Sequence, residues 1–126
     1  MIALDTHVLL WWTLEPKRLS APARRAIDHA DALGVSSIVF WEVALLARKG
    51  KIELGTNAEE WARELLSLPR VVTLDLTPAI ALRAEALKMH PDPADRFLVA
   101  TALEHALSLV TSDALIKKSK LVPTVW

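Results

Sequence analysis

The chain of 126 residues contains no cysteine, no tyrosine and only three glycines. Without cysteine it can form neither a disulfide nor a thiolate metal site, which excludes the common zinc sites. Its formal net charge is zero, so any binding of nucleic acid has to depend on a local patch. No apolar run approaches the roughly 18 residues of a membrane span. The N-terminal segment MIALDTHVLLWW lacks the basic start of a signal peptide. We therefore expect a cytoplasmic protein without a membrane segment.

Apolar residues are abundant and make up 52% of the chain. This fraction, together with the length, predicts a single packed domain over residues 1–126. Five tryptophans accompany only two phenylalanines. Tryptophan is enriched at interfaces, so we expect some of the five to serve one, with core filling as the alternative.

Short apolar runs alternate with helical patterns along the whole chain. Strands are expected at residues 2–4, 35–37, 71–74 and 109–111, with a last one near Val125. Helices are expected at residues 7–14, 21–32, 38–49, 58–68, 78–88, 94–106 and 113–118. Ser20, Asn57 and Thr77 are candidate N-caps. This alternation predicts a three-layer α/β/α sandwich with a central parallel sheet.

Two acidic residues follow predicted strands. Asp5 comes directly after the first strand, and Asp113 comes two residues after strand 109–111. Because ligands bind beyond the carboxyl ends of parallel strands, both residues are predicted to share one functional rim of the sheet. The alternative for each is a local role as the N-cap of the following helix.

Glu42 and Asp95 lie on helix faces that are otherwise apolar. The residues three and four positions from Glu42 are Ile38, Val39, Leu45 and Leu46, and those that follow Asp95 on its face are Leu98, Val99 and Ala102. The alternatives are an ion pair of Glu42 with Arg96, and a favourable interaction of Asp95 with the helix dipole. Asp92, three residues before Asp95, is expected to cap the helix or shape the turn rather than contact a metal.

Asp5, Glu42, Asp95 and Asp113 together predict one acidic cluster. Carboxylates are costly to bury unpaired, and their mutual repulsion requires a compensating positive charge. Ligand sets made of oxygen favour Mg²⁺ or Mn²⁺. Such an ion lowers the pKa of a bound water, which can then attack a phosphodiester in line with the leaving oxygen. The cluster therefore predicts a metal-dependent hydrolase.

Four segments also resemble a known family: LDTHVLLW, FWEVALLARKGKIEL, DPADRFLVATAL and LVTSDALI. In this order and spacing they resemble PIN-domain proteins, and among these the VapC-type toxins of bacterial and archaeal toxin–antitoxin pairs. The resemblance implies an Mg²⁺- or Mn²⁺-dependent endoribonuclease. It matches the family's four catalytic, metal-binding acids to Asp5, Glu42, Asp95 and Asp113.

The resemblance also implies auxiliary residues. Thr6 matches the polar companion of the first acid, Asp92 matches an auxiliary acid, and Thr111 and Ser112 match small polar residues of the rim.

The implied partners are an RNA substrate, a second copy of the chain in a homodimer, and a cognate antitoxin that holds the toxin inactive. Adjacent helical residues point about 100° apart. Trp11 and Trp12 therefore cannot both enter one core face, and one of them is expected to line a partner surface. The alternative is that Trp12 covers a neighbouring helix.

Other functions compete with this one. A receiver-type phosphoacceptor domain needs an acidic pair after its first strand, whereas Asp5 stands alone and Asp75 is the only candidate in the middle of the chain. A non-catalytic interaction module has no need of four converging acids, which cost stability when idle. A hydrolase of DNA or another phosphodiester stays open on the residues alone.

Overall fold

The computed structural model describes residues 1–126 and has a five-stranded, wholly parallel sheet in the order β3-β2-β1-β4-β5. The strands are β1 (Ile2–Leu4), β2 (Leu33–Ser36), β3 (Val71–Leu74), β4 (Leu109–Val110) and β5 (Thr124–Val125). The central strand, β1, lies between β2 and β4, which come from distant parts of the chain. The predicted parallel sheet is confirmed.

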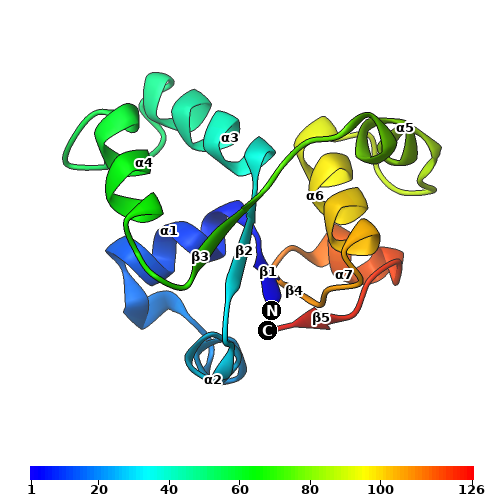
Figure 1. Ribbon diagram of the computed structural model, residues 1–126, viewed down its shortest axis with the longest axis horizontal. Helices are drawn as coiled ribbons and strands as arrows, with labels where there is room; N and C mark the ends of the chain where they lie inside the picture. Colours follow the sequence, from blue (N-terminus) through cyan, green and yellow to red (C-terminus); the bar gives the residue numbers. More distant parts are fainter.

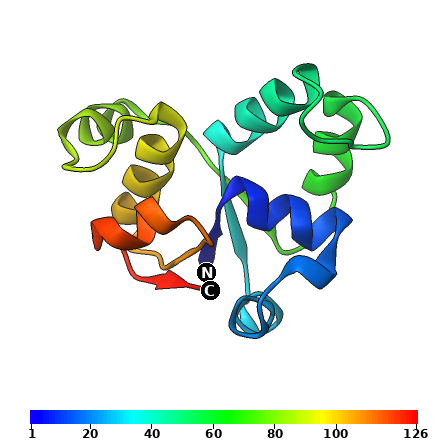
Figure 2. The same ribbon diagram turned by 180° about the vertical axis from the view of Figure 1, so that it is seen from behind.

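Helices pack on both sides of this sheet. They are α1 (Thr6–Leu14), α2 (Ala21–His29), α3 (Ser37–Arg48), α4 (Ala58–Leu66), α5 (Pro78–Ala86), α6 (Pro93–Glu104) and α7 (Ala114–Ser119), with a short 3-10 turn, η1 (Pro16–Arg18). In Figure 1, α1, α3 and α4 gather to the left of the sheet and α5, α6 and α7 to its right. The view from behind in Figure 2 shows the same division. The predicted three-layer α/β/α architecture is confirmed. None of these helices is long and apolar enough to span a membrane.

The predicted N-caps have the expected geometry. The side chains of Ser20, Asn57 and Thr77 each accept a hydrogen bond from the backbone N–H three residues later, at 3.1, 2.8 and 3.2 Å. These bonds satisfy N–H groups that have no partner within the helix. Proline follows in the first turn of α2 and α5, where its missing N–H costs nothing.

Several predicted ends were wrong. The helix predicted at 21–32 ends at His29, because Ala30 is already extended, and β2 begins at Leu33 rather than Val35. The helices predicted to reach residues 68, 88 and 106 end two residues earlier, at Leu66, Ala86 and Glu104. Helix ends fray, and sequence periodicity fixes them poorly. The 3-10 turn η1 was not predicted.

A core of 22 buried residues joins the sheet to the helices around it. Leu4, Val35 and Leu109 contribute from three neighbouring strands and are fully buried. Leu9 of α1 and Val99 of α6 are also fully buried and belong to the same core. This packing fixes the starts of α1 and α6 relative to the carboxyl ends of the strands.

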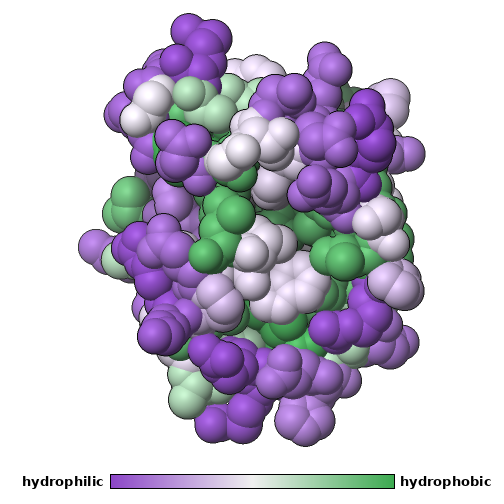
Figure 3. Space-filling model, turned by 90° about the vertical axis from the view of Figure 1, so that its left-hand side faces the viewer, coloured by the Kyte–Doolittle hydropathy of each residue, from purple (hydrophilic) through white to green (hydrophobic).

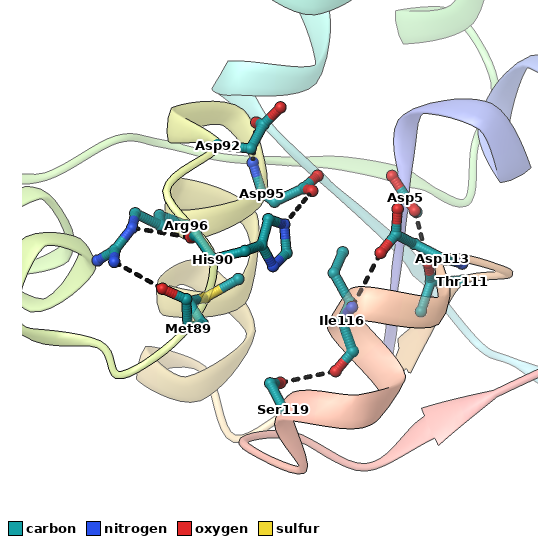
Figure 4. A network of polar contacts seen from close by, with 10 residues as sticks. All are labelled: Asp5, Met89, His90, Asp92, Asp95, Arg96, Thr111, Asp113, Ile116 and Ser119. Carbon is teal, nitrogen blue, oxygen red and sulfur yellow. Dashed lines mark hydrogen bonds and ion pairs between the residues drawn. The ribbon is translucent and has the colours of Figure 1, made fainter.

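Arg96 of α6 stabilises the loop that joins α5 to α6. Its guanidinium donates hydrogen bonds to the backbone carbonyls of Ala84, Glu85, Leu87, Met89 and His90, at 2.8 to 3.4 Å. Figure 4 shows the bonds to Met89 and His90. The alternative in which Arg96 pairs with Glu42 was therefore wrong, because the donors of Arg96 are directed to the backbone.

We expect Arg96→Leu to lower the free energy of unfolding by about 2–3 kcal/mol, because it leaves several partly buried carbonyls without donors. Arg83→Leu is the matched control, since Arg83 makes an exposed ion pair with Glu104. Its loss should cost at most about 1 kcal/mol. Urea denaturation followed by circular dichroism measures both. Equal losses for the two variants would contradict the anchoring role.

Candidate active site

Asp5 is buried directly beyond the end of β1, with only 7% of its surface exposed. Its Oδ1 accepts a hydrogen bond from the backbone N–H of Thr6 at 2.6 Å, and its Oδ2 accepts one from the Thr111 hydroxyl at 2.5 Å. The Thr111 oxygen in turn accepts the backbone N–H of Asp113 at 3.0 Å. These bonds join the segments that follow β1 and β4, so Asp5 and Asp113 lie at one rim of the sheet.

Asp95 and Asp113 come together across this rim. Each offers a carboxylate oxygen, and with a ring nitrogen of His90 these atoms lie within 4.8 Å of one another. Asp113 is the N-cap of α7, where its Oδ1 accepts the N–H of Ile116 at 2.8 Å. Asp95 lies in the first turn of α6. Figure 4 shows its carboxylate directed from α6 towards Asp5 and Asp113.

Glu42 reaches the site through a side-chain hydrogen bond. The Thr6 hydroxyl donates to Oε1 of Glu42, while the Thr6 backbone N–H donates to Asp5. Glu42 is half-buried, whereas Val39 and Val43 of the same helix are fully buried. Glu42 therefore lies at the edge of the buried face of α3, beside the cluster rather than inside the 4.8 Å group.

One of the auxiliary residues has a local structural role. Asp92 is exposed and caps α6, accepting the backbone N–H of Asp95 at 3.1 Å, as expected for a capping residue. Ser112 lies half-buried between Thr111 and Asp113.

His90 was not among the site residues predicted from the sequence. Its Nε2 lies 2.7 Å from Oδ2 of Asp95. The one available signal was its place five residues before Asp95, in a turn that carries Pro91 and Pro93. The bonds of Arg96 that shape this turn have no sequence signature.

A family model described as the PIN domain matches residues 2–120. The chain belongs to the PIN-domain family. It is 41% identical to Ribonuclease VapC22 of Mycobacterium tuberculosis over 129 aligned residues, which cover 99% of this chain and 98% of that protein. The resemblance to VapC-type proteins drawn from the four motifs is thus confirmed.

Solved structures share the fold of this PIN domain. A toxin–antitoxin complex from Klebsiella pneumoniae matches with a TM-score of 0.69 and 21% identity, covering 97% of this chain and 95% of the other. VapBC2 from Rickettsia felis, bound to a DNA fragment from its promoter, matches with a TM-score of 0.72 and 16% identity, covering 98% and 97%.

Two acids of this PIN domain, Asp5 and Asp95, have raised pKa values. Burial raises the pKa of Asp5 to about 6, the hydrogen bond from Thr111 opposes the rise, and the charge of Asp95 adds to it. Burial also raises the pKa of Asp95, while its bond to His90 opposes the rise and the charges of Asp92 and Asp113 add to it. A divalent cation bound among these oxygens would relieve the same repulsion. The donor set, mostly carboxylate oxygen, fits Mg²⁺ or Mn²⁺.

We expect Asp5→Asn to stabilise the metal-free protein at neutral pH. The pKa of Asp5 in the folded state, about 6, lies above the ordinary 3.8, so the folded state holds the proton more tightly. The wild type therefore loses stability as the pH rises from about 4 through about 6. Asparagine carries no charge, and its amide can still bond to Thr6 and Thr111. The stability gain of the variant should be greater at pH 7.5 than at pH 4, by about 1–3 kcal/mol.

Urea denaturation in EDTA at the two pH values measures this difference. Asp75→Asn is the control, because Asp75 also follows a strand but is exposed. A gain for Asp5→Asn that does not change between pH 4 and pH 7.5 would show that Asp5 is not strained by burial.

Proposed function

We propose that this PIN domain is an Mg²⁺- or Mn²⁺-dependent endoribonuclease and the toxin of a toxin–antitoxin pair. One observation carries the proposal: Asp5, Asp95 and Asp113, from three separate elements, gather at the carboxyl rim of the sheet. The similarity to a full-length relative named a ribonuclease agrees with it.

We assign the metal to Asp5, Asp95, Asp113 and Glu42. When bound, the ion supplies an activated water for in-line attack on the phosphodiester and neutralises developing charge. The protein's own bonds orient these ligands. Thr111 holds Asp5, and Thr6 holds Glu42. Asp113 uses Oδ1 as a helix cap and keeps its second oxygen for the ion.

Cleavage of tRNA and other structured RNAs, with Mg²⁺, Mn²⁺ or EDTA, tests this assignment. Asp5→Asn and Asp95→Asn should each reduce the rate by on the order of 10²- to 10³-fold, because metal assistance is worth several kcal/mol. Asp75→Asn, the exposed acid after β3, should retain the wild-type rate. Single-stranded DNA of the same sequence should resist cleavage. A wild-type rate for Asp5→Asn, or cleavage that continues in EDTA, would contradict the metal-dependent mechanism.

We further propose that the cognate antitoxin packs an apolar helix into a groove between α1 and α4. This groove has a volume of about 430 Å³ and is lined mainly by hydrophobic side chains. Its lining includes Trp12, Leu14, Leu54, Trp61, Leu65 and Leu68. Figure 3 views this side of the molecule and shows hydrophobic side chains in the middle of the face, bordered by hydrophilic ones.

Trp12, rather than Trp11, faces this partner surface. Trp11 is half-buried too but does not line the groove; the Arg18 guanidinium lies 4.7 Å from its ring centroid, and the centroid of the Trp126 ring lies at 5.5 Å. Trp12 is half-buried and lines the groove. This arrangement supports the proposal that one of the two adjacent tryptophans lines a partner surface.

Leu68→Glu should weaken binding of the antitoxin at least about 10-fold, because it puts a charge where apolar surface is to be buried. Leu68 is 39% exposed, so the free protein should stay folded. Leu82→Glu, at a residue 76% exposed on α5, is the matched control and should leave the affinity unchanged. The antitoxin to be tested is any small DNA-binding protein that a reading frame next to this gene encodes, and calorimetry gives both affinities. Equal weakening of binding by the two variants, or no weakening by Leu68→Glu, would exclude the groove as the antitoxin-binding site.

We also propose that the protein acts as a homodimer in the cytoplasm, where RNA is available. Several large apolar side chains outside the groove are exposed, among them Trp41, Val72 and Leu76. A second copy of the chain would shield such surface from water.

A further inference from the structure

His90 lies in the turn between α5 and α6, and its ring points at Asp95 (Figure 4). The two side chains are 15% and 18% exposed, and Nε2 of His90 is 2.7 Å from Oδ2 of Asp95. An ionised carboxylate can only accept a hydrogen bond. When Asp95 is ionised, the ring therefore donates from Nε2. A nitrogen that carries this proton is not free to coordinate a metal.

The backbone of His90 is fixed from the same helix that carries Asp95. Arg96, the next residue in α6, donates to the carbonyl of His90 at 3.1 Å and to that of Met89 at 2.8 Å. Asp92 caps the same helical turn through the N–H of Asp95. The ring is thus held at one end by Arg96 through the backbone and at the other by the Asp95 carboxylate.

Asp95 needs such support because the charges around it disfavour its present orientation. Its carboxylate faces the negative charges of Asp92 and Asp113, and it also raises the proton affinity of Asp5. Without a donor on Oδ2, the side chain is free to rotate away from these charges towards solvent. The hydrogen bond to the ring leaves Oδ1 available on the side of the other acids.

We propose that His90 is a positioning residue: by donating from Nε2, it holds the Asp95 carboxylate in the orientation in which it shares a cation with Asp5 and Asp113. This inference rests on the metal site of the proposed function. His90 itself does not touch the ion. Removing a donor to a ligating carboxylate typically costs 10- to 100-fold in metal affinity.

The test measures Mn²⁺ affinity by calorimetry at pH 7.5, without RNA. His90→Phe keeps a ring but has no donor, and it should weaken binding 10- to 100-fold. His90→Gln places an amide N–H near the position of Nε2 and should restore the affinity to within about threefold. His105→Leu, at the exposed C-terminal end of the same helix, should behave as wild type. If His90→Phe does not fold by circular dichroism, His90→Asn replaces it, because the shorter amide does not reach Asp95.

The outcomes separate this inference from the proposed function. Wild-type affinity in His90→Phe or His90→Asn, with binding still dependent on Asp5, overturns the role of His90 alone. Failure of His90→Gln to rescue also overturns it. So does a directly coordinated histidine nitrogen in the pulsed paramagnetic resonance spectrum of the Mn²⁺-bound, ¹⁵N-histidine-labelled protein. No Mn²⁺ binding by the wild type, or binding unaffected by Asp5→Asn, overturns the metal site itself.

Discussion

Burial of the Asp5 carboxylate at the end of β1 is the constraint on which the site depends. A charge in this position loses its hydration, and the protein replaces only part of it, with the Thr6 N–H and the Thr111 hydroxyl. The remaining deficit appears as a pKa raised to about 6. Either a proton or a cation can remove it. The neighbours of Asp5 at the site are further carboxylates rather than a lysine or an arginine. Such a set of side chains is suited to binding a metal ion and cannot form a permanent ion pair with Asp5.

The acids serve the fold and the site with different oxygens. Asp113 caps α7 with Oδ1, and Asp5 accepts the first N–H of α1 with its own Oδ1. A cap fixes the side-chain torsions of an aspartate, so the second oxygen is held in a defined direction. The capping and metal-binding interpretations of these residues are therefore compatible. Where a helix begins just beyond the carboxyl end of a strand, one residue can both cap the helix and bind a metal.

Much of the fold followed from local sequence. Alternating apolar runs gave the strands, and Ser20, Asn57 and Thr77 marked helix starts, because both signals depend on neighbours in the chain. The rim followed from topology, since Asp5 and Asp113 come after strands that point the same way. His90 and Arg96 could not be read in this way. Their roles depend on where the loop between α5 and α6 returns in space, and backbone carbonyls that accept from an arginine leave no pattern in the sequence. The link from Glu42 through Thr6 is hidden for the same reason.

The geometry also discriminates among the alternatives. Asp75, the mid-chain acid that a receiver-type domain would need, is exposed and follows β3, the edge strand, whereas Asp5 follows the central strand. β2 lies between the two strands, so these acids do not form a phosphoacceptor pocket. An interaction module without catalysis would be more stable with neutral residues at positions 5 and 95, because burial raises the pKa of both carboxyls. Threonine donors hold Asp5 and Glu42 in place, and a histidine faces Asp95. Burial and mutual repulsion disfavour these acids in their charged form, yet hydrogen bonds orient them. A metal-dependent nuclease needs ligands oriented in this way, whereas a binding surface does not need them.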